Sequence, residues 1–368
     1  MIINTNKDKT SFLTSKIQQA VHAQQALNIV AGNSKAFYGR TIDCKNLNIS
    51  THSGIINYEP SELVMTVRSG TKLTEINLEL NKNNQMLAFE PPQFNANTTI
   101  GGSIACGLSG SRRPFFGSAR DFILGCRIIN GKGENLRFGG EVIKNVAGYD
   151  ASRLMTGALG TLGVILDVSI KVLPKPESEL TLVQTLSTEA ALKLMLHLKR
   201  QAFPISGLCF YSNHLFIRLS GSKKTLDKTQ AIIGGELLTN TFIESELSFS
   251  WQQLDNHSLD FFNTNKNLWR ISVKPNTPAL NIKDDCIYGW AGAERWITSD
   301  KDNKTMLELA SKAKGHATLF RVTNENTNKT NNTKFQPLST SLLTLHKELK
   351  KSFDPYNILN PGKLYSEI

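Results

Sequence analysis

Glycine-rich loops are the segments of this sequence best suited to bind an anionic cofactor. Fourteen of the 26 glycines fall between Gly101 and Gly163, in a stretch otherwise rich in isoleucine, valine and leucine. Successive backbone N–H groups in such loops can form a concave, positively polarised nest for phosphate. No GxGxxG follows a strand and opens a helix, and no GxxxxGK[ST] occurs in the chain. A nucleotide bound by this chain must therefore use a loop that is neither of the Rossmann nor of the Walker type.

The first candidate loop is Gly32-Asn33-Ser34-Lys35, which follows a predicted strand at residues 27–31. Its glycine allows a ligand to approach closely, its polar side chains donate hydrogen bonds, and its lysine supplies positive charge. These residue types suit an anion. A plain turn after a strand has the same composition, and this alternative stays open on the sequence alone.

Two further loops have the glycine content of a cofactor site. After the rigid Pro91-Pro92 turn, residues 98–105 combine two hydroxyl groups with a double glycine, where a ligand can lie against bare backbone. Residues 157–165 bring three evenly spaced glycines into an apolar strand, whose exposed edge we expect to pair with a flat heterocycle. For residues 98–105 the alternative is a plain Gly-Gly turn. For residues 157–165 the alternative is a helix-to-strand turn, which would need only one of the three glycines.

Short strands and helices in alternation position these loops. The patterns predict a helix at residues 14–25, a strand at residues 62–68, and then a helix capped by Thr71 with apolar residues at three- and four-residue steps. An alternating strand is predicted at residues 164–173 and ends at two prolines that mark a domain boundary. A last amphipathic helix at residues 339–353 is expected to pack back on the first domain.

We therefore expect a first domain at residues 1–175 and a more polar second domain at residues 176–336. The C-terminal helix and tail at residues 337–368 are expected to return to the first domain. The Asn- and Thr-rich residues 323–333 are expected to form a surface loop.

Composition and charge disfavour several classes of protein. No apolar run reaches the roughly 18 residues of a membrane-spanning helix, and the start of the chain is polar, so we expect a cytoplasmic protein. The formal charge of +11 comes from scattered lysines and arginines. It fits contact with acidic lipid heads or an acidic partner better than binding of nucleic acid. The cysteines are widely spaced, without the CxxC pattern of zinc or iron–sulfur sites, at positions Cys44, Cys106, Cys126, Cys209 and Cys286.

Several motifs occur in an order that resembles the vanillyl-alcohol-oxidase-type, or PCMH-type, FAD-binding flavoproteins. They are Gly32-Asn33-Ser34, Thr99-Ile100-Gly101-Gly102-Ser103, Gly148-Tyr149-Asp150, Gly160-Thr161-Leu162-Gly163 and Asn360-Pro361-Gly362-Lys363. Within that family the chain is most similar, over essentially its whole length, to the FAD-binding E subunits of bacterial glycolate oxidases. The resemblance implies an α+β protein, with a two-subdomain FAD-binding fold and a smaller α+β C-terminal domain.

The resemblance also implies which residues hold the FAD. The first loop would hold the pyrophosphate, residues 99–103 would pass along the flavin and its ribityl chain, and the third loop would line the isoalloxazine or adenine. The implied set is Gly32, Asn33, Ser34, Lys35, Pro91, Thr99, Ile100, Gly101, Gly102, Ser103, Gly117, Ser118, Asp121, Gly160, Gly163, Val164, Ile165 and Asn360. The pyrophosphate loop has neither histidine nor cysteine, so the FAD is expected to be non-covalent. No metal site is expected.

The chain also departs from its catalytic relatives. Related 2-hydroxy-acid dehydrogenases often have a glutamate before the Gly-Thr-Leu-Gly turn and a histidine-rich motif in the second domain, whereas this chain has Leu159 and isolated histidines. Oxidation of a 2-hydroxy acid needs a cation for the carboxylate and a base for the hydroxyl proton. Arg270 and His316 are the candidates. Arg270, beside Trp269, has the alternative of a buried ion-pair partner.

The resemblance implies an FAD-carrying subunit of a multi-subunit dehydrogenase that oxidises glycolate, a small 2-hydroxy acid, to glyoxylate. Its implied partners are a second FAD-binding catalytic subunit and an iron–sulfur subunit that passes electrons toward quinone. The complex would lie in the cytoplasm, at the inner face of the membrane through its partners. Two alternatives stay open: a non-catalytic flavin-fold assembly subunit, and a stand-alone D-lactate-type flavin dehydrogenase.

Overall fold

The computed structural model describes residues 7–140, 151–239, 248–323 and 333–368, and it divides into two compact units. Unit 1 comprises Met1–Leu108, Ser118–Pro174 and Pro337–Ile368, and unit 2 comprises Ser109–Gly117 and Lys175–Gln336. The sequence interpretation placed Ser109–Gly117 in the first domain. This placement is corrected, because Phe115 in that segment packs against the hydrophobic core of unit 2.

Unit 1 is built on a five-stranded sheet in the order β3-β4-β8-β6-β7, in which all neighbours are antiparallel. Its strands are β3 (Ile55–Glu59), β4 (Val64–Arg68), β6 (Ile123–Ile129), β7 (Asn135–Gly139) and β8 (Val164–Lys171). β8 lies at the centre, and every residue from Val164 to Ile170 is buried. The expected alternation of buried and exposed residues is therefore wrong for this strand, because both of its faces are covered.

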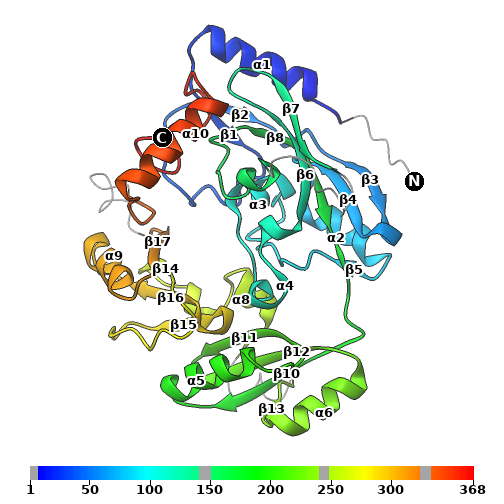
Figure 1. The fold of residues 1–368 in the computed structure, drawn as a ribbon, viewed down its shortest axis with the longest axis vertical. Coiled ribbons are helices and arrows are strands. Elements are labelled where there is room, and N and C mark those ends of the chain that lie inside the picture. The colour runs from blue at the N-terminus through cyan, green and yellow to red at the C-terminus, as the bar shows by residue number, and fades with distance from the viewer. Residues whose placement is uncertain (1–6, 141–150, 240–247, 324–332) are drawn as a thin grey trace. The chain divides into compact units, whose positions relative to one another are not determined.

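Two small sheets and four α-helices complete the described part of unit 1. The sheets are the parallel pair β1 (Leu27–Val30) and β2 (Lys45–Asn48), and the antiparallel pair β5 (Gln85–Met86) and β9 (Leu173–Pro174). The helices are α1 (Thr10–His22), α2 (Leu73–Asn81), α3 (Ile100–Cys106) and α10 (Thr340–Phe353). Figure 1 shows the red C-terminal segment beside the blue strands β1 and β2, and the Leu27 N–H donates to the Ile358 carbonyl at 2.7 Å.

Local sequence signals locate these helices with differing accuracy. α10 confirms the helix expected at residues 339–353, and Ser339 caps it by accepting a hydrogen bond from the Leu342 N–H at 3.4 Å. α1 begins and ends several residues earlier than expected. Thr71 does not cap α2. The N-cap position is Lys72, and the Thr71 hydroxyl instead donates to the Arg68 carbonyl at 2.7 Å.

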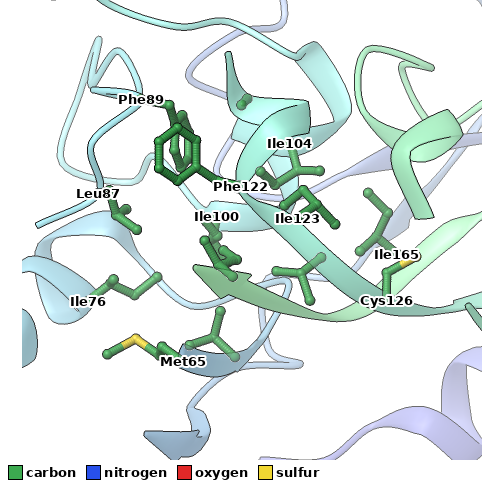
Figure 2. Close-up of a cluster of buried hydrophobic side chains, with 14 of the residues drawn as sticks. Met65, Ile76, Leu87, Phe89, Ile100, Ile104, Phe122, Ile123, Cys126 and Ile165 are labelled. Atoms are coloured by element: carbon green, nitrogen blue, oxygen red, sulfur yellow. The ribbon is translucent and has the colours of Figure 1, made fainter. Parts of the chain in front are cut away.

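The main core of unit 1 lies between the five-stranded sheet and helices α2 and α3. Figure 2 shows Met65, Ile76, Ile100 and Ile104 within it. Ile100 and Ile104 are four residues apart and therefore share one face of α3, which packs against the sheet. The partly buried Leu349 and Phe353 of α10 pack against the same core, which confirms that the C-terminal helix returns to the first domain.

Unit 2 is an eight-stranded antiparallel sheet in the order β13-β10-β12-β11-β15-β16-β14-β17, with helices packed on it. The strands are β10 (Ser178–Thr185), β11 (Ile205–Tyr211), β12 (His214–Gly221), β13 (Glu236–Leu237), β14 (Asn267–Ser272), β15 (Cys286–Gly289), β16 (Glu294–Ser299) and β17 (His316–Arg321). The helices are α4 (Arg113–Phe116), α5 (Thr188–Lys199), α6 (Lys223–Ile233), α8 (Trp251–Asp255) and α9 (Asn303–Lys312). Among the described helices of both units, none has the length and apolar character needed to cross a membrane.

Candidate cofactor site

A pocket of about 280 Å³ opens in unit 1 where β1 ends. The loop after β1 forms one wall, α3 contributes a second, and the C-terminal tail a third. Its lining residues are Asn28, Ile29, Val30, Ala31, Gly32, Asn33, Ser34, Lys35, Ala36, Tyr38, Thr41, Ile42, Asn46, Thr99, Gly102, Ala105, Cys106, Leu159, Asn360 and Lys363. This set contains two lysines and no carboxylate, so the pocket suits an anionic ligand.

The loop at residues 32–35 presents unpaired backbone donors at this pocket. Within the described part of the chain, none of its four N–H groups donates a hydrogen bond. Asn33 adopts a left-handed conformation with φ of 55°. A Cβ on Gly32 would lie 1.5 Å from the Asn97 carbonyl oxygen, so only glycine lets the two backbones pass. Successive unpaired N–H groups in a turn of this kind form an anion nest.

Lys35 adds positive charge at the same wall. Its ammonium donates to the Ser103 hydroxyl at 3.4 Å and lies 5.5 Å from the centre of the Phe94 ring. The side chain is only 8% exposed, and this burial lowers the pKa of Lys35 from 10.5 to about 8, against a smaller opposing effect of Cys106. Burial also lowers the pKa of Lys363. Both ammonium groups have lost part of their contact with water, and a bound phosphate would compensate for this loss.

α3 supplies the wall opposite the nest. Thr99 caps this helix by accepting from the Gly102 N–H at 3.3 Å, and both residues line the pocket. Gly101 faces the other way, since a Cβ there would lie 2.4 Å from the Ser69 Cβ. Ser103 is fully buried behind Lys35 and donates its hydroxyl hydrogen to the Thr99 carbonyl at 3.0 Å.

The C-terminal tail closes the pocket through Asn360. Its side-chain oxygen accepts from the Ile29 N–H at 2.7 Å, and its amide nitrogen donates to the Leu159 carbonyl at 2.6 Å. Lys350 of α10 anchors the tail beneath: its ammonium contacts the Asp354 carboxylate at 2.7 Å and the Thr161 carbonyl at 2.8 Å. Asn360 therefore joins β1 to the turn at Leu159 and lines the pocket at the same time.

The pocket belongs to a chain whose relatives are flavoproteins. A family model described as FAD binding domain matches residues 13–139, and one described as FAD linked oxidases, C-terminal domain, matches residues 335–364. Glycolate oxidase subunit GlcE of Escherichia coli (strain K12) is 42% identical over 361 residues, which cover 98% of this chain and 99% of that protein. The chain belongs to the GlcE family of PCMH-type FAD-binding flavoproteins. FAD is its cofactor, which confirms the prediction from the sequence, and its family is one of oxidoreductases.

More distant relatives match a part of this GlcE-family chain. Glycolate oxidase subunit GlcD of Bacillus subtilis (strain 168) is 30% identical over 42% of the chain and 32% of its own length. D-lactate dehydrogenase of Anaerostipes hadrus is 29% identical over 37% of the chain and 28% of its own length. The solved structure of p-cresol methylhydroxylase superposes with a TM-score of 0.72 at 14% identity, covering 98% of this chain and 88% of that one. This likeness confirms the expected α+β, PCMH-type fold.

The residues of this GlcE-family pocket fit part of an FAD molecule. Four unpaired N–H groups and two lysines, without an opposing carboxylate, match the charge of a diphosphate. The volume lies just below the range for whole drug-sized ligands, so the pocket would take one portion of the cofactor. Of the sequence-predicted residues, seven line it: Gly32, Asn33, Ser34, Lys35, Thr99, Gly102 and Asn360. Sequence reasoning missed Tyr38, Cys106, Leu159 and Lys363 as lining residues, although Lys363 follows Asn360 in a motif already noted.

The other predicted residues lie outside the pocket lining. Ser118 and Asp121 form a reciprocal cap on a short 3₁₀ turn, with the Ser118 hydroxyl 2.7 Å from the Asp121 carboxylate. Gly117, which was expected beside them, belongs to unit 2. Pro91 and Ile100 are buried residues of unit 1. These five residues keep a cofactor role only as a prediction.

The third glycine loop leads into β8, which is paired along one of its two edges where it begins. β8 pairs with β6 over its first residues, with Val164 opposite Ile129 and Ile165 opposite Ile128. Figure 2 shows Ile165 beside Cys126 within the core. Gly160 instead makes room for the tail, because a Cβ there would lie 2.9 Å from the Asn360 amide nitrogen.

Gly163 has a similar packing reason, since its Cβ would lie 2.7 Å from Ile128 Cδ1. Contact of this loop with the flavin stays a prediction. The quoted motif at residues 148–150 lies outside the described residues, as does most of the expected loop at residues 323–333.

The two catalytic candidates lie together in unit 2. Ser272 of β14 pairs with His316 of β17, and Arg270 precedes Ser272 by two residues on the same face. His316 is exposed at the start of β17, and partial desolvation of its ring together with the charges of Arg270 and Arg113 lowers its pKa, which favours the neutral imidazole. The described residues contain no group of three or more histidine, cysteine, aspartate or glutamate side chains able to hold a metal ion.

Proposed function

We propose that this chain is the FAD-carrying subunit of a multi-subunit dehydrogenase that oxidises glycolate to glyoxylate and passes electrons toward an iron–sulfur subunit and quinone. The observation that carries the proposal is the 42% identity to glycolate oxidase subunit GlcE over nearly the full length of both chains. The anion nest beside the buried Lys35 and the half-buried Lys363 supports it independently. A GlcD-like FAD-binding subunit and an iron–sulfur subunit are the proposed partners, and the names of GlcE and GlcD as subunits support an assembly.

Bound FAD would supply the capacity to accept two electrons, which a substrate can deliver as a hydride. The N–H groups of residues 32–35, together with Lys35 and Lys363, would hold its diphosphate. Thr99 and Gly102 would bound the same cavity from α3, and Asn360 would keep the tail closed on it. The pyrophosphate would then replace water that the buried Lys35 and the half-buried Lys363 have lost, and would form charge-assisted hydrogen bonds with both.

We further propose that the FAD is held without a covalent bond. Cys106 lines the pocket, and burial raises the pKa of its thiol to about 11, against a smaller lowering by Lys35 and Lys363. A thiol needs its thiolate form to attack, and this form is scarce at neutral pH. Denaturation should therefore release the cofactor intact.

Two other functions have a specific observation in their favour. Leu159, rather than a carboxylate, lines the pocket at the start of the Gly-Thr-Leu-Gly turn. This supports an assembly subunit whose flavin is not reduced by substrate directly. The partial similarity to D-lactate dehydrogenase supports a stand-alone enzyme for a related acid. A cytoplasmic location, at the inner membrane face through the partners, belongs to the proposal and fits the basic charge.

The test is the visible spectrum of the purified chain. One portion is treated with acid to release flavin, and another receives glycolate or D-lactate anaerobically. Acid-releasable FAD that neither substrate bleaches supports a subunit that depends on its partners. Adding the GlcD-like and iron–sulfur subunits should then permit bleaching by glycolate. Bleaching of the isolated chain selects the stand-alone enzyme, and flavin that stays oxidised in the assembled, active complex selects the assembly subunit.

A further inference from the structure

A fully buried histidine lies in the turn between β2 and β3 of unit 1. The side chain of His52 is 0% exposed, and its Nδ1 accepts a hydrogen bond from the Lys9 N–H at 2.9 Å. A ring nitrogen that accepts a hydrogen bond carries no proton, so this imidazole is neutral and has its proton on Nε2. Nε2 has no hydrogen-bond partner among the described residues. The one hydrogen bond that the described residues make to the ring therefore exists only in its neutral form.

The turn that carries His52 is fixed on its other side. The His52 N–H donates to the Ile49 carbonyl at 3.0 Å, and the His52 carbonyl accepts from the Gly70 N–H at 2.8 Å. A Cβ on Gly70 would lie 2.6 to 2.7 Å from the carbonyl oxygens of residues 49, 50 and 52, so only glycine allows this close approach. The imidazole cannot withdraw from Lys9 without breaking this contact. A change at Nδ1 must therefore displace the segment that carries Lys9.

That segment, the N-terminal strap (residues 8–10), leads into α1. The Asp8 carboxylate accepts from the Thr10 N–H at 2.8 Å, which caps the start of a helix whose N-cap residue, Lys9, makes no side-chain cap. Its Oδ1 lies 3.7 Å from His52 Nδ1, and its Oδ2 lies 3.6 Å from the Arg68 guanidinium. Burial opposes ionisation of Asp8, but hydrogen bonding from Thr10 and the nearby positive charges outweigh it and lower the pKa of Asp8 to about 2. Asp8 is therefore ionised wherever histidine titrates.

Four charged groups face the His52 ring, two of each sign. Asp8 lies on the strap and Arg68 ends β4, while Arg127 of β6 donates to the Asp167 carboxylate of β8 at 2.6 Å. Burial has the largest effect and lowers the pKa of His52. The two arginines lower it further, and the two aspartates act in the opposite direction. Because the charges oppose each other, burial decides, and the closed strap favours the neutral imidazole.

The helix that follows the strap supports the cofactor pocket. Leu13 and Ile17 of α1 are buried in one cluster with Leu27 of β1 and Leu359 of the C-terminal tail. A β-bridge joins Leu27 to Leu359, and the next residue, Asn360, lines the pocket. Packing of α1 on this cluster therefore helps to hold β1 and the tail together at the pocket.

We propose that His52 is a proton-sensitive switch, which holds the N-terminal strap closed when neutral and releases it, together with the support that α1 gives the FAD pocket, when protonated. A proton on Nδ1 turns the acceptor into a donor, so two N–H groups would face each other 2.9 Å apart. The fixed turn leaves the strap as the part that moves. Its departure removes the Asp8 cap from α1, and the first turns of the helix then loosen from the cluster beneath.

The direction of the pH dependence follows from burial. In the open form His52 contacts water and has its ordinary pKa of about 6.5, whereas the pKa in the closed form is lower. The open form therefore binds more protons as the pH falls below about 6.5, and acid favours opening by at most about tenfold for each pH unit. Asp8 attracts the imidazolium in the closed form and makes this effect smaller. Above about pH 7 both forms are neutral at His52, and the strap stays closed.

The test follows amide hydrogen exchange of α1 in the full FAD-loaded chain between pH 7 and pH 5. Each rate is divided by the intrinsic exchange rate at that pH, and α5 of unit 2 serves as the internal reference. Protection of α1 should fall by up to about 25-fold, the limit for one histidine with an ordinary pKa of about 6.5. The Kd for FAD, measured by calorimetry, should rise over the same range.

Two outcomes would overturn the proposal. Unchanged or increased protection of α1 at pH 5 would show that pairing of the imidazolium with Asp8 keeps the strap closed. A fall in protection with an unchanged Kd for FAD would show that α1 does not support the pocket, and the switch would then control nothing.

Variants assign the effect to His52. His52→Asn places an amide oxygen near the position of Nδ1, so it can accept from the Lys9 N–H at every pH. At pH 5 this variant should keep the protection of α1 and the FAD affinity that it has at pH 7. His22→Asn, at the exposed last residue of α1, is the matched control and should lose protection like the wild type. An acid loss in His52→Asn as large as that of the wild type would sink the proposal.

Asp8→Asn tests whether burial or the carboxylate controls the strap. The variant keeps an oxygen that can accept from the Thr10 N–H, but it removes a charge that raises the pKa of His52. Between pH 7 and pH 5 it should lose at least as much protection as the wild type. A smaller loss would contradict the argument from burial. If His52→Asn fails to fold, this variant and the pH profile of the wild type still decide.

Discussion

Replacing Lys35 with methionine should stabilise the FAD-free chain and weaken FAD binding. In the free pocket, burial lowers the pKa of Lys35 from 10.5 to about 8. Below pH 8 the lysine is charged in both the folded and the unfolded chain, so folding must desolvate a charged group. At 1.36 kcal/mol for each pH unit, the lowering of the Lys35 pKa corresponds to a cost to folding of about 3 kcal/mol. Methionine keeps most of the length without the charge. The free energy of unfolding of the FAD-free chain should therefore rise by about 1–3 kcal/mol.

The same substitution removes a charge-assisted contact from the proposed diphosphate site. Such a contact contributes about 1.5–3 kcal/mol, so the Kd for FAD should rise roughly ten- to 150-fold. Calorimetry with FAD measures this Kd, and thermal melting of the FAD-free chain measures the opposite change. Lys132→Met, at an exposed lysine of unit 1, is the control for both. An unchanged Kd in Lys35→Met would refute the placement of the diphosphate at this loop, and a lower melting temperature would refute the desolvation argument.

Three more outcomes follow from the same pocket. The wild-type affinity for FAD should fall as the pH rises through 8, because only protonated Lys35 attracts the diphosphate. Calorimetry between about pH 7 and pH 9.5 measures this affinity, and an affinity that does not change with pH would contradict the prediction. Gly32→Ala should abolish FAD retention on gel filtration, because the added Cβ would overlap the Asn97 carbonyl. The control Gly221→Ala should retain FAD, because the Cβ added there would lie 3.8 Å from its nearest heavy atom. Asn360→Ala should lower the free energy of unfolding by about 2–4 kcal/mol in a denaturant titration, because it removes one buried and one partly buried hydrogen bond. A change below about 0.5 kcal/mol would show that the tail closes without them.

Local patterns in the sequence predicted the parts of the fold that depend on neighbouring residues. The C-terminal helix is an example, since its apolar spacing and the cap at Ser339 are both local. Thr71 is the counterexample: its residue type suits a helix cap, but its hydroxyl bonds to Arg68 because the preceding strand brings that carbonyl nearby. The segment Ser109–Gly117 likewise joins unit 2 through a packing contact of Phe115 that no local pattern encodes.

In the candidate site, too, adjacent residues indicate some of the functional groups and not others. The residue types from Gly32 to Lys35 are sufficient to indicate an anion loop, because a nest is formed by consecutive backbone groups. For Ser118 and Asp121, whose hydrogen bonds satisfy each other in a cap, the cofactor role implied by the resemblance stays a prediction. The same holds for Val164 and Ile165, which pair with β6 along one strand edge.

The sequence by itself determined the FAD-binding family, the α+β fold class and the loop whose backbone suits a diphosphate, since these depend on ordered motifs and on runs of adjacent residues. Only the tertiary structure decided that Lys363 and Cys106 share a pocket with Lys35, and that Asp8 lies against His52. Packing of α1 and the return of the tail bring these residues together across long stretches of chain. Their burial and mutual charge, which set their pKa values, arise only once the chain has folded.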